Sequence, residues 1–495
     1  MARPTRDIED QSALNSARVD LGSRIGWMLR TWRMHRDLDL RALAELAGGA
    51  AAFSTLSRWE AAGVRRSAMI DGYERAMSLG YGALRAPIDT MCRTFVYAPE
   101  DGAPLPLRDS VSDFDAICAQ VDDNPTGADW LRFAEAHASG PFGMPPRDLR
   151  PRVRRLAVEM SNSVGAGYRL RYEALARLRC SRYGDVVVAV AVELIEIPGV
   201  QRAADLVSAA CEQGSPELLT WCGRLLIHDS DIVARAAAAG IQNICAVGGV
   251  DGNHWAWLVP LLVAAVHDLD VHPGRAGTLA ATISVTPRPV RAAVEAAARG
   301  RMPTPARSTD WSPGRRNQDY ARAMDLAHSL TSAVGPSAGS GLLARLVFEV
   351  VFDVRAAHAV TSAFLLAASP YGDEVTRQAV AMSRNHNGQR LALVADHALA
   401  SMMPNTDFLD PIGVHGSPER IRLALRVEAL AGRRPDVPAT GLRELIRDRS
   451  MRGATLFALG MSADPLVAEL AADSADPEVQ RACRWWLDAG PRVSE

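Results

Sequence analysis

Residues 25–79 read IGWMLRTWRMHRDLDLRALAELAGGAAAFSTLSRWEAAGVRRSAMIDGYERAMSL, and they hold the most specific structural pattern of this 495-residue chain. Apolar residues recur there every three to four positions, which is the spacing of amphipathic helices. The first expected helix runs from Ile25 to about His35. Its apolar face would consist of Ile25, Met28, Leu29 and Trp32. The stretch as a whole predicts a compact block of four short helices.

Polar and glycine-rich positions separate the expected helices. Asp39 stands where its carboxylate can cap a second helix over 40–47, before the pair Gly48-Gly49. A third helix is expected over 54–62, and Ser67 would cap the fourth. The inner faces of these helices would be formed by Leu43, Ala44, Ala47, Leu56, Trp59, Ile70, Tyr73, Met77 and Leu79.

The order L-x-x-W-R, then L-D-L-R-A-L-A-E-L-A-G, then S-T-L-S-R-W-E-A-A-G resembles the Cro/C1-type (XRE-like) helix-turn-helix over residues 20–82. In that family the third helix enters the major groove of double-stranded DNA, and its first residues meet base edges. The resemblance implies DNA-facing roles for Ser54, Thr55 and Arg58, and Arg58 could pair with a guanine edge. It also implies phosphate contacts for Arg33, Arg41, Arg65 and Arg66.

The stretch departs from the family pattern at two places. The turn GGAAAFST is about two residues longer than usual, so the third helix either begins earlier, within 50–53, or is aimed differently. Leu40 stands where the family often has a glutamine, which removes a common DNA contact. The three tryptophans of the block, Trp27, Trp32 and Trp59, lie on or beside the apolar stripe and are expected in the core rather than against bases.

Charge supports a local nucleic-acid contact but not a general one. The chain has 55 basic and 57 acidic residues, a formal net charge of −2, and all its basic residues are arginine. Between Arg24 and Arg66 there are eight arginines against Asp37, Asp39, Glu45 and Glu60, a surplus of four. A basic patch on one block of an otherwise acidic protein fits that balance.

The bulk composition indicates a large helical protein of two to four folding units. Apolar residues make up 48% of the chain and aromatic residues 6%, and no apolar run approaches the length of a membrane span. The polar, mixed-charge N-terminus does not resemble a signal peptide. Seven scattered cysteines without a C-x-x-C pair predict reduced, buried thiols in a cytoplasmic protein without membrane partners.

The organisation expected along the chain is a helix-turn-helix domain over 20–96, a linker over 97–113 and a helical body over 114–302 and 318–495, divided by a linker or long loop over 303–317. Many of the expected helices of this body begin with a capping residue or a proline, as at Ser215-Pro216, Ser417-Pro418 and Asp476-Pro477. This irregular repetition resembles HEAT-like helical repeats, which stack into an α-solenoid. A compact helical bundle is the alternative. The β-branched run 186–195 is interpreted as a buried helix.

No set of residues predicts an enzyme, a cofactor or a metal. The string Gly335-Pro336-Ser337-Ala338-Gly339 matches a nucleophile elbow, but a helical pattern precedes it where a strand is required. The histidines and aspartates within 254–272 lack the spacing of a metal site on one helix. Ten arginines between Arg147 and Arg182 indicate either a second nucleic-acid surface or, more simply, a solvated helix face.

The sequence therefore predicts an all-α, nucleoid-associated transcriptional regulator that acts as a homodimer on double-stranded DNA. Its helical body would dimerise, bind a peptide, small-molecule or protein effector, or do both. A flexible body of that kind could change the spacing of two DNA-reading blocks when a ligand binds. The rival hypothesis is a protein-interaction scaffold of a defence or developmental pathway, whose N-terminal block docks a protein partner.

Overall fold

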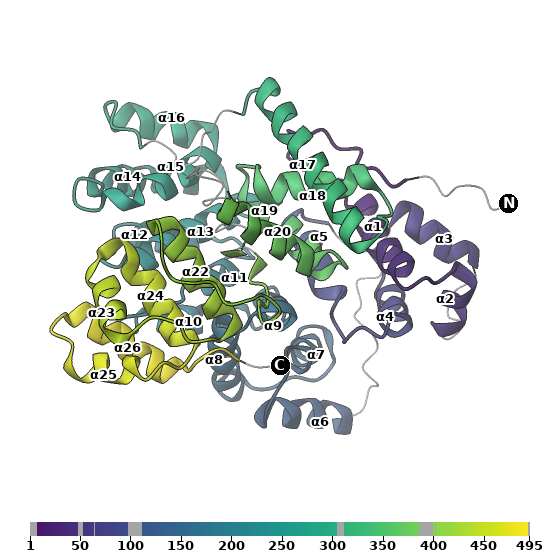
Figure 1. Ribbon diagram of the computed structural model, residues 1–495, viewed down its shortest axis with the longest axis horizontal. Coiled ribbons are helices and arrows are strands. Elements are labelled where there is room, and N and C mark those ends of the chain that lie inside the picture. Colours follow the sequence, from purple (N-terminus) through teal and green to yellow (C-terminus); the bar gives the residue numbers. More distant parts are fainter. Residues whose placement is uncertain are drawn as a thin grey trace. The chain divides into compact units, whose positions relative to one another are not determined.

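The computed structural model describes residues 7–47, 53–63, 65–97, 111–303, 311–385, 399–400 and 402–493. The regular elements in these ranges are all helices, so the expected all-α fold is confirmed for the described chain (Figure 1). None of those helices is both long and apolar enough to cross a membrane. Most of the linker expected over 97–113, and residues 304–310 of the second expected linker, lie outside the described residues.

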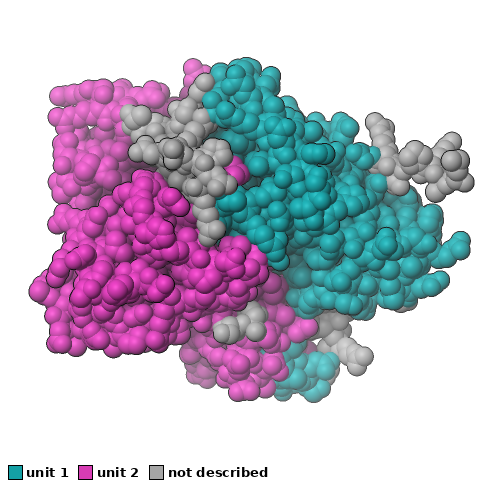
Figure 2. Space-filling view, viewed as in Figure 1, with its two compact units in different colours: residues 1–118, 310–381, 394–404 teal, residues 119–309, 382–393, 405–495 magenta. Residues whose placement is uncertain are grey.

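The chain divides into two compact units, coloured separately in Figure 2. Unit 1 comprises residues 1–118, 310–381 and 394–404, and unit 2 comprises residues 119–309, 382–393 and 405–495. This division differs from the expected one, because the stretch 318–495 is shared between both units. The physical reason lies in the N-terminal block, whose apolar faces are buried against helices of residues 313–381.

Unit 1 consists of eight complete described helices, most of a ninth, which the division cuts after Ala381, and the first part of a tenth, which it cuts after Cys118. They are α1 (Leu21–His35), α2 (Leu40–Leu46), α3 (Phe53–Ala62), α4 (Ser67–Ala76), α5 (Arg85–Thr94), α17 (Pro313–Val334), α18 (Ser340–Val351), α19 (Ala356–Ala368), α20 (Gly372–Asn385) and the start of α6 (Val111–Asp122). One apolar core joins the two sequence-distant parts. In it, Ile25 and Met28 of α1 are fully buried together with Leu342 and Phe348 of α18.

Unit 2 contains the remaining helices. They are α7 (Gly127–Ser139), α8 (Pro146–Asn162), α9 (Gly165–Arg179), α10 (Gly184–Ile195), α11 (Ala204–Ala210), α12 (Pro216–Leu225), α13 (Asp231–Val247), α14 (Gly252–Asp268), a 3₁₀ turn (Pro273–Arg275), α15 (Ala276–Val285), α16 (Arg288–Ala297), α22 (Pro418–Ala431), α23 (Ala439–Arg447), α24 (Arg449–Met461), α25 (Leu466–Asp473) and α26 (Pro477–Ala489).

In unit 2, a helix often packs beside the next helix but one along the chain. One row runs α7, α9, α11, α13 and α15, and a second runs α12, α14 and α16. Stacked helix pairs produce this alternation, although a regular solenoid stays a prediction. The β-branched run 186–195 lies in α10, where Val187, Val190 and Leu194 are buried, so its interpretation as a buried helix is confirmed.

Local signals placed most helix starts correctly. The side chains of Ser215, Ser417 and Asp476 each accept a hydrogen bond from the first turn of the helix that follows. Ser67 is an exception, because it is the first residue of α4 and the cap position is Arg66, which makes no side-chain capping bond. The expectation of buried thiols holds for five cysteines but not for Cys180, which is exposed, or Cys245, which is half-buried.

Candidate nucleic-acid interface

The four helices of the N-terminal block, α1 to α4, begin and end close to the expected positions. Asp39 caps α2 by accepting hydrogen bonds from the backbone N–H of Arg41 and Ala42 at 2.9 and 2.8 Å. These bonds lower the pKa of Asp39. α3 begins at Phe53, so of the two alternatives for its start the earlier one holds. The pair Gly48-Gly49 lies outside the described residues.

Glycines bring the backbones of α1 and α3 into direct contact. A Cβ atom added at Gly26 would lie 2.5 Å from the carbonyl oxygen of Glu60, and one added at Gly63 would clash with the carbonyl oxygen of Gly22. Any larger residue at either position would therefore push the two helices apart. This contact fixes one side of α3 against α1, which leaves the opposite side facing outward.

A buried carboxylate holds the C-terminal half of α3. Glu60 Oε1 accepts hydrogen bonds from Arg33 Nε at 2.6 Å and from the Tyr73 hydroxyl at 2.9 Å, while Oε2 accepts from Arg33 Nη2 at 2.8 Å. The Arg33 Nη1 group also donates to the Leu38 carbonyl at 2.7 Å. The network therefore ties α3 to α1, to α4 and to the turn before α2. Burial and the charge of Glu60 together raise the pKa of Tyr73, which keeps its hydroxyl a donor.

The outward side of α3 carries the residues for which base contacts were expected. Ser54 and Arg58 are exposed, and Thr55 is half-buried one position further along. Arg58 Nε donates weakly to the Ser54 carbonyl at 3.4 Å, so the guanidinium lies along the first turns of the helix. The structure thus brings Ser54, Thr55 and Arg58 together on one accessible stretch. Arg41, in the first turn of α2, and Arg66, before α4, are also exposed.

The structure does not bring Arg33 and Arg65 to this surface. Arg33 is committed to Glu60, and Arg65 forms a two-pronged ion pair with Asp89 at 2.7 and 2.9 Å. Both side chains are largely buried, so neither reaches a phosphate without breaking an internal pair. The expected phosphate contacts at these two positions are therefore corrected, and both arginines hold the block together.

Internal ion pairs of this kind also reduce the excess of positive charge on the surface of the block. Arg24 and Arg30 are buried as well, and Glu60 is an internal group rather than a surface charge. The exposed charges that remain between residues 24 and 66 are Arg36, Arg41, Arg58, Arg66, Asp37, Asp39 and Glu45. Four arginines against three carboxylates leave a surplus of one instead of four. The sequence count missed this because it does not show which charges are paired inside.

The tryptophans of the block belong to its core, as expected. Trp27 is fully buried, while Trp32 and Trp59 are half-buried against the same apolar cluster. The Trp27 indole donates to Ser337 Oγ at 2.8 Å, and the Trp32 indole donates to the Ala368 carbonyl at 2.9 Å. Ser337, the centre of the elbow-like string, therefore lies in the loop between α17 and α18 as a hydrogen-bond partner of α1.

The ten arginines between Arg147 and Arg182 do not form a free basic surface, and only those of α8 that are exposed, Arg147, Arg150 and Arg154, fit the expected solvated face. Nine of them are engaged with carboxylates or carbonyl oxygens. Examples are the pairing of Arg150 and Arg154 with Glu193, and that of Arg177 with Glu135. The others that have partners are Arg147, Arg152, Arg155, Arg171, Arg179 and Arg182. The exception is Arg169.

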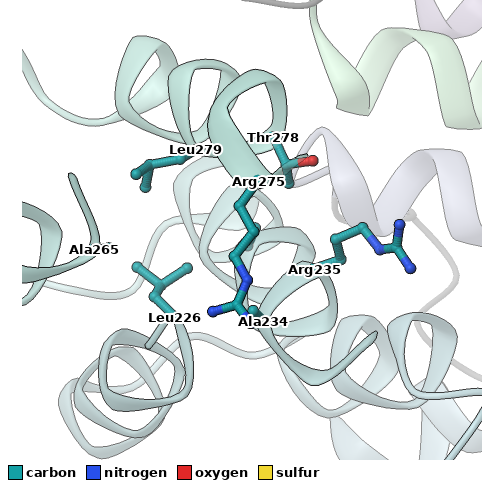
Figure 3. Close-up of a pocket in the computed structure, with 8 residues that line it drawn as sticks. Leu226, Ala234, Arg235, Ala265, Arg275, Thr278 and Leu279 are labelled. Carbon is teal, nitrogen blue, oxygen red and sulfur yellow. The ribbon is translucent and has the colours of Figure 1, made fainter. Parts of the chain in front are cut away.

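A pocket in unit 2 is lined by Leu226, Ala234, Arg235, Ala238, Ala265, Arg275, Thr278 and Leu279, and it encloses about 280 Å³ including the solvent space at its mouth. Arg275 crosses it but is already bound to Asp231 at 2.7 Å and Asp268 at 2.9 Å. Figure 3 shows the Arg235 guanidinium turned away from Leu226 and Leu279. The pocket therefore presents an apolar floor and a neutralised arginine, and no charged group points into it to select a ligand.

Two of the three histidines within 254–272 have a local partner. His254 Nδ1 lies 2.7 Å from Asp251, and His272 Nδ1 lies 3.1 Å from Asp268. Within the described parts of the chain, no group of three or more histidine, cysteine, aspartate or glutamate side chains is arranged to hold a metal ion.

Comparison of the chain with models of known protein families, with curated proteins and with solved structures found no match.

Proposed function

We propose that the N-terminal block binds double-stranded DNA in a sequence-specific way and that the protein is a transcriptional regulator of the cytoplasm. One observation carries this proposal. The first turns of α3 are accessible and present Ser54, Thr55 and Arg58, whereas the opposite side of the helix is fixed by Gly26, Gly63 and the Glu60 network. A helix held rigidly on one side and lined with hydroxyl and guanidinium groups on the other is suited to a major groove.

The modest charge of the surface implies that one block binds DNA weakly. Arg41, Arg58 and Arg66 are the exposed arginines of the block for which DNA contacts are proposed. Two blocks in a homodimer, about 34–36 Å apart, would double the contacts and read two half-sites. With three cations in each block, log K should fall against log salt with a slope of about −5. An effector bound by the helical body, whether peptide, small molecule or protein, would act by changing that spacing.

The test is a selection of duplex sequences from a random library, followed by mobility-shift titration of the enriched sequence. Wild type should enrich one motif, and Arg58→Ala should lose about 1–3 kcal/mol of discrimination at one base pair. Arg443→Ala is the matched control, since it removes an exposed, paired arginine of α23 far along the chain. Enrichment of no motif by wild type, or an unchanged motif with Arg58→Ala, would contradict the proposal.

Docking of a protein partner is the second candidate function, and one observation favours it. Leu46 at the end of α2 is 55% exposed, and Phe53 at the start of α3 is 58% exposed. Apolar side chains of this size on an accessible helix pair are typical of protein interfaces. Salt dependence separates the two functions, because an apolar protein contact has a slope near zero rather than about −5.

A further inference from the structure

Arg169 of α9 is a nearly buried arginine without a partner. Its exposed fraction is 8%, yet among the described residues it makes no hydrogen bond or ion pair, in contrast to the nine other arginines between residues 147 and 182. Glu173, one turn further along α9, accepts hydrogen bonds from Arg177 instead. Burial lowers the pKa of Arg169 to about 10, so the group is still charged at neutral pH. Most of the side chain is buried, but none of its nitrogens is among the fully buried side-chain atoms that lack a hydrogen-bond partner, so the guanidinium still meets solvent.

The N-terminus of α9 lies one turn from this arginine. Helical side chains lean toward the N-terminus of their helix, so we infer that the Arg169 side chain runs toward Gly165 and Ala166. Val164, the cap residue, supplies no side-chain capping bond to the first turn. Gly165 is half-buried and Ala166 is exposed, whereas Gly167 is buried, and the first N–H groups of a helix have no partner within the helix.

A third donor lies against the same turn. A Cβ atom added at Gly165 would be in van der Waals contact with Asn405, 3.4 Å from its Cβ atom. Asn405 Oδ1 accepts hydrogen bonds from Arg492 Nη2 at 3.2 Å and from the backbone N–H of Asp407 at 3.0 Å. These two hydrogen bonds identify Oδ1 as the acceptor side of the amide, so the Nδ2 group of Asn405 remains as a donor. Gly165 has a φ of +60°, a conformation that favours glycine and leaves room beside Asn405.

We propose that Arg169, the first turn of α9 and the Asn405 amide form a binding site for a phosphate-type oxyanion. Helix N-termini bind such anions because their N–H groups and dipole converge on negative charge. The guanidinium adds the charge-assisted hydrogen bonds that it lacks within the protein. A tetrahedral dianion offers more acceptor positions to donors from three directions than a planar carboxylate does. The site is independent of the proposed DNA contacts, which lie in unit 1.

The test is isothermal titration of the full-length protein with inorganic phosphate at constant ionic strength, together with thermal melting. Wild type should bind one phosphate, and Arg169→Met should weaken that binding by about ten-fold or more. Without phosphate, Arg169→Met should melt no lower than wild type, because an uncompensated charge is replaced by an apolar chain of similar length. Asn405→Asp, an exposed change that replaces the donor with a negative charge, should also weaken binding.

Two control variants separate this site from other basic groups. Arg154→Met removes an exposed, paired arginine of α8 and should leave phosphate affinity unchanged. Arg58→Ala should also leave it unchanged, so failure of the DNA proposal does not affect this result. A glycerol phosphate arm distinguishes the source of the anion. Tighter binding than inorganic phosphate indicates a phosphate ester, and equal or weaker binding indicates the free ion; both support the site.

Three outcomes would overturn the proposal. The first is unchanged phosphate affinity in both Arg169→Met and Asn405→Asp. The second is a melting temperature of phosphate-free Arg169→Met well below that of wild type, which would show that the arginine already has a stabilising role. The third is acetate binding more tightly than phosphate at equal ionic strength, which would exclude the tetrahedral anion.

Discussion

Arg24 of α1 and Glu349 of α18, 325 residues apart in the chain, form a fully buried two-pronged ion pair with both N–O distances at 2.8 Å. Asp10 and Ser362 add hydrogen bonds to the same guanidinium. Burial alone would raise the pKa of Glu349, but the charge and hydrogen bonds of Arg24 bring it to about 2. This pair joins the N-terminal block to the helices of residues 313–381, so unit 1 behaves as one folded body.

Replacing Glu349 by Gln should strongly destabilise unit 1. The change leaves Arg24 charged and buried with only Asp10 to balance it, and it also removes the carboxylate to which the buried Arg345 donates at 2.7 Å. Breaking a buried ion pair in this way typically costs about 3–5 kcal/mol. Urea denaturation followed by tryptophan fluorescence measures the change in unfolding free energy. The double variant Arg24→Met/Glu349→Leu should recover only part of the loss, since it removes both charges of the pair but leaves Asp10 without Arg24 and Arg345 without Glu349. A single variant as stable as wild type would show that the pair contributes little.

A fragment of residues 1–97 should not fold by itself. It lacks Ser337, Ala368 and Glu349, which satisfy the Trp27 indole, the Trp32 indole and Arg24. It also exposes the side of α1 that packs against α18. Circular dichroism and amide hydrogen exchange of the fragment should show little protected helix. A cooperative thermal transition close to that of the full chain would contradict the integrated unit.

Substitution of Gly63 by alanine should separate α1 from α3. The added Cβ meets the backbone of Gly22 and Gly26, which cannot move without shifting α1. We expect a loss of about 1–3 kcal/mol or more in unfolding free energy. Gly80→Ala is the control, because a Cβ atom there has no neighbour within 4 Å. Equal stability of the two variants, measured by thermal melting, would argue against the close helix contact.

Stability should depend on pH through His137 of α7, which is fully buried and has Nδ1 2.9 Å from the Phe133 carbonyl. Burial lowers the pKa of His137 from 6.5 to about 4. The folded state therefore favours the neutral form of His137. The contribution of this residue to the free energy of unfolding is fully present above pH 6.5. It is lost as the pH falls from 6.5 toward 4, up to about 3 kcal/mol.

The check for His137 is denaturant unfolding at several pH values. In wild type the unfolding free energy should fall between pH 6.5 and 4, and His137→Phe should lack that component because phenylalanine does not titrate. His254→Phe serves as a comparison at a partly exposed histidine. A pH profile unchanged by His137→Phe would show that other groups cause the decline.

The sequence by itself predicted the parts that depend on neighbouring residues. The 3.6-residue apolar period located α1 to α4, and Asp39, Ser215 and Asp476 marked helix starts because a capping bond spans only two or three residues. The exposed positions of α3 could also be identified, since burial on one side of a short helix leaves the other side open. The all-helical class followed from the same signals repeated along the chain.

Only the tertiary structure decided which charges are internal. Arg33 and Arg65 look like surface cations in the sequence, yet Glu60 and Asp89, both more than twenty residues away, bury and neutralise them. The pairing of Arg24 with Glu349 and the isolation of Arg169 are decided in the same way. An ion pair depends on two side chains meeting in space, and no local pattern records which distant helix will lie opposite a given arginine.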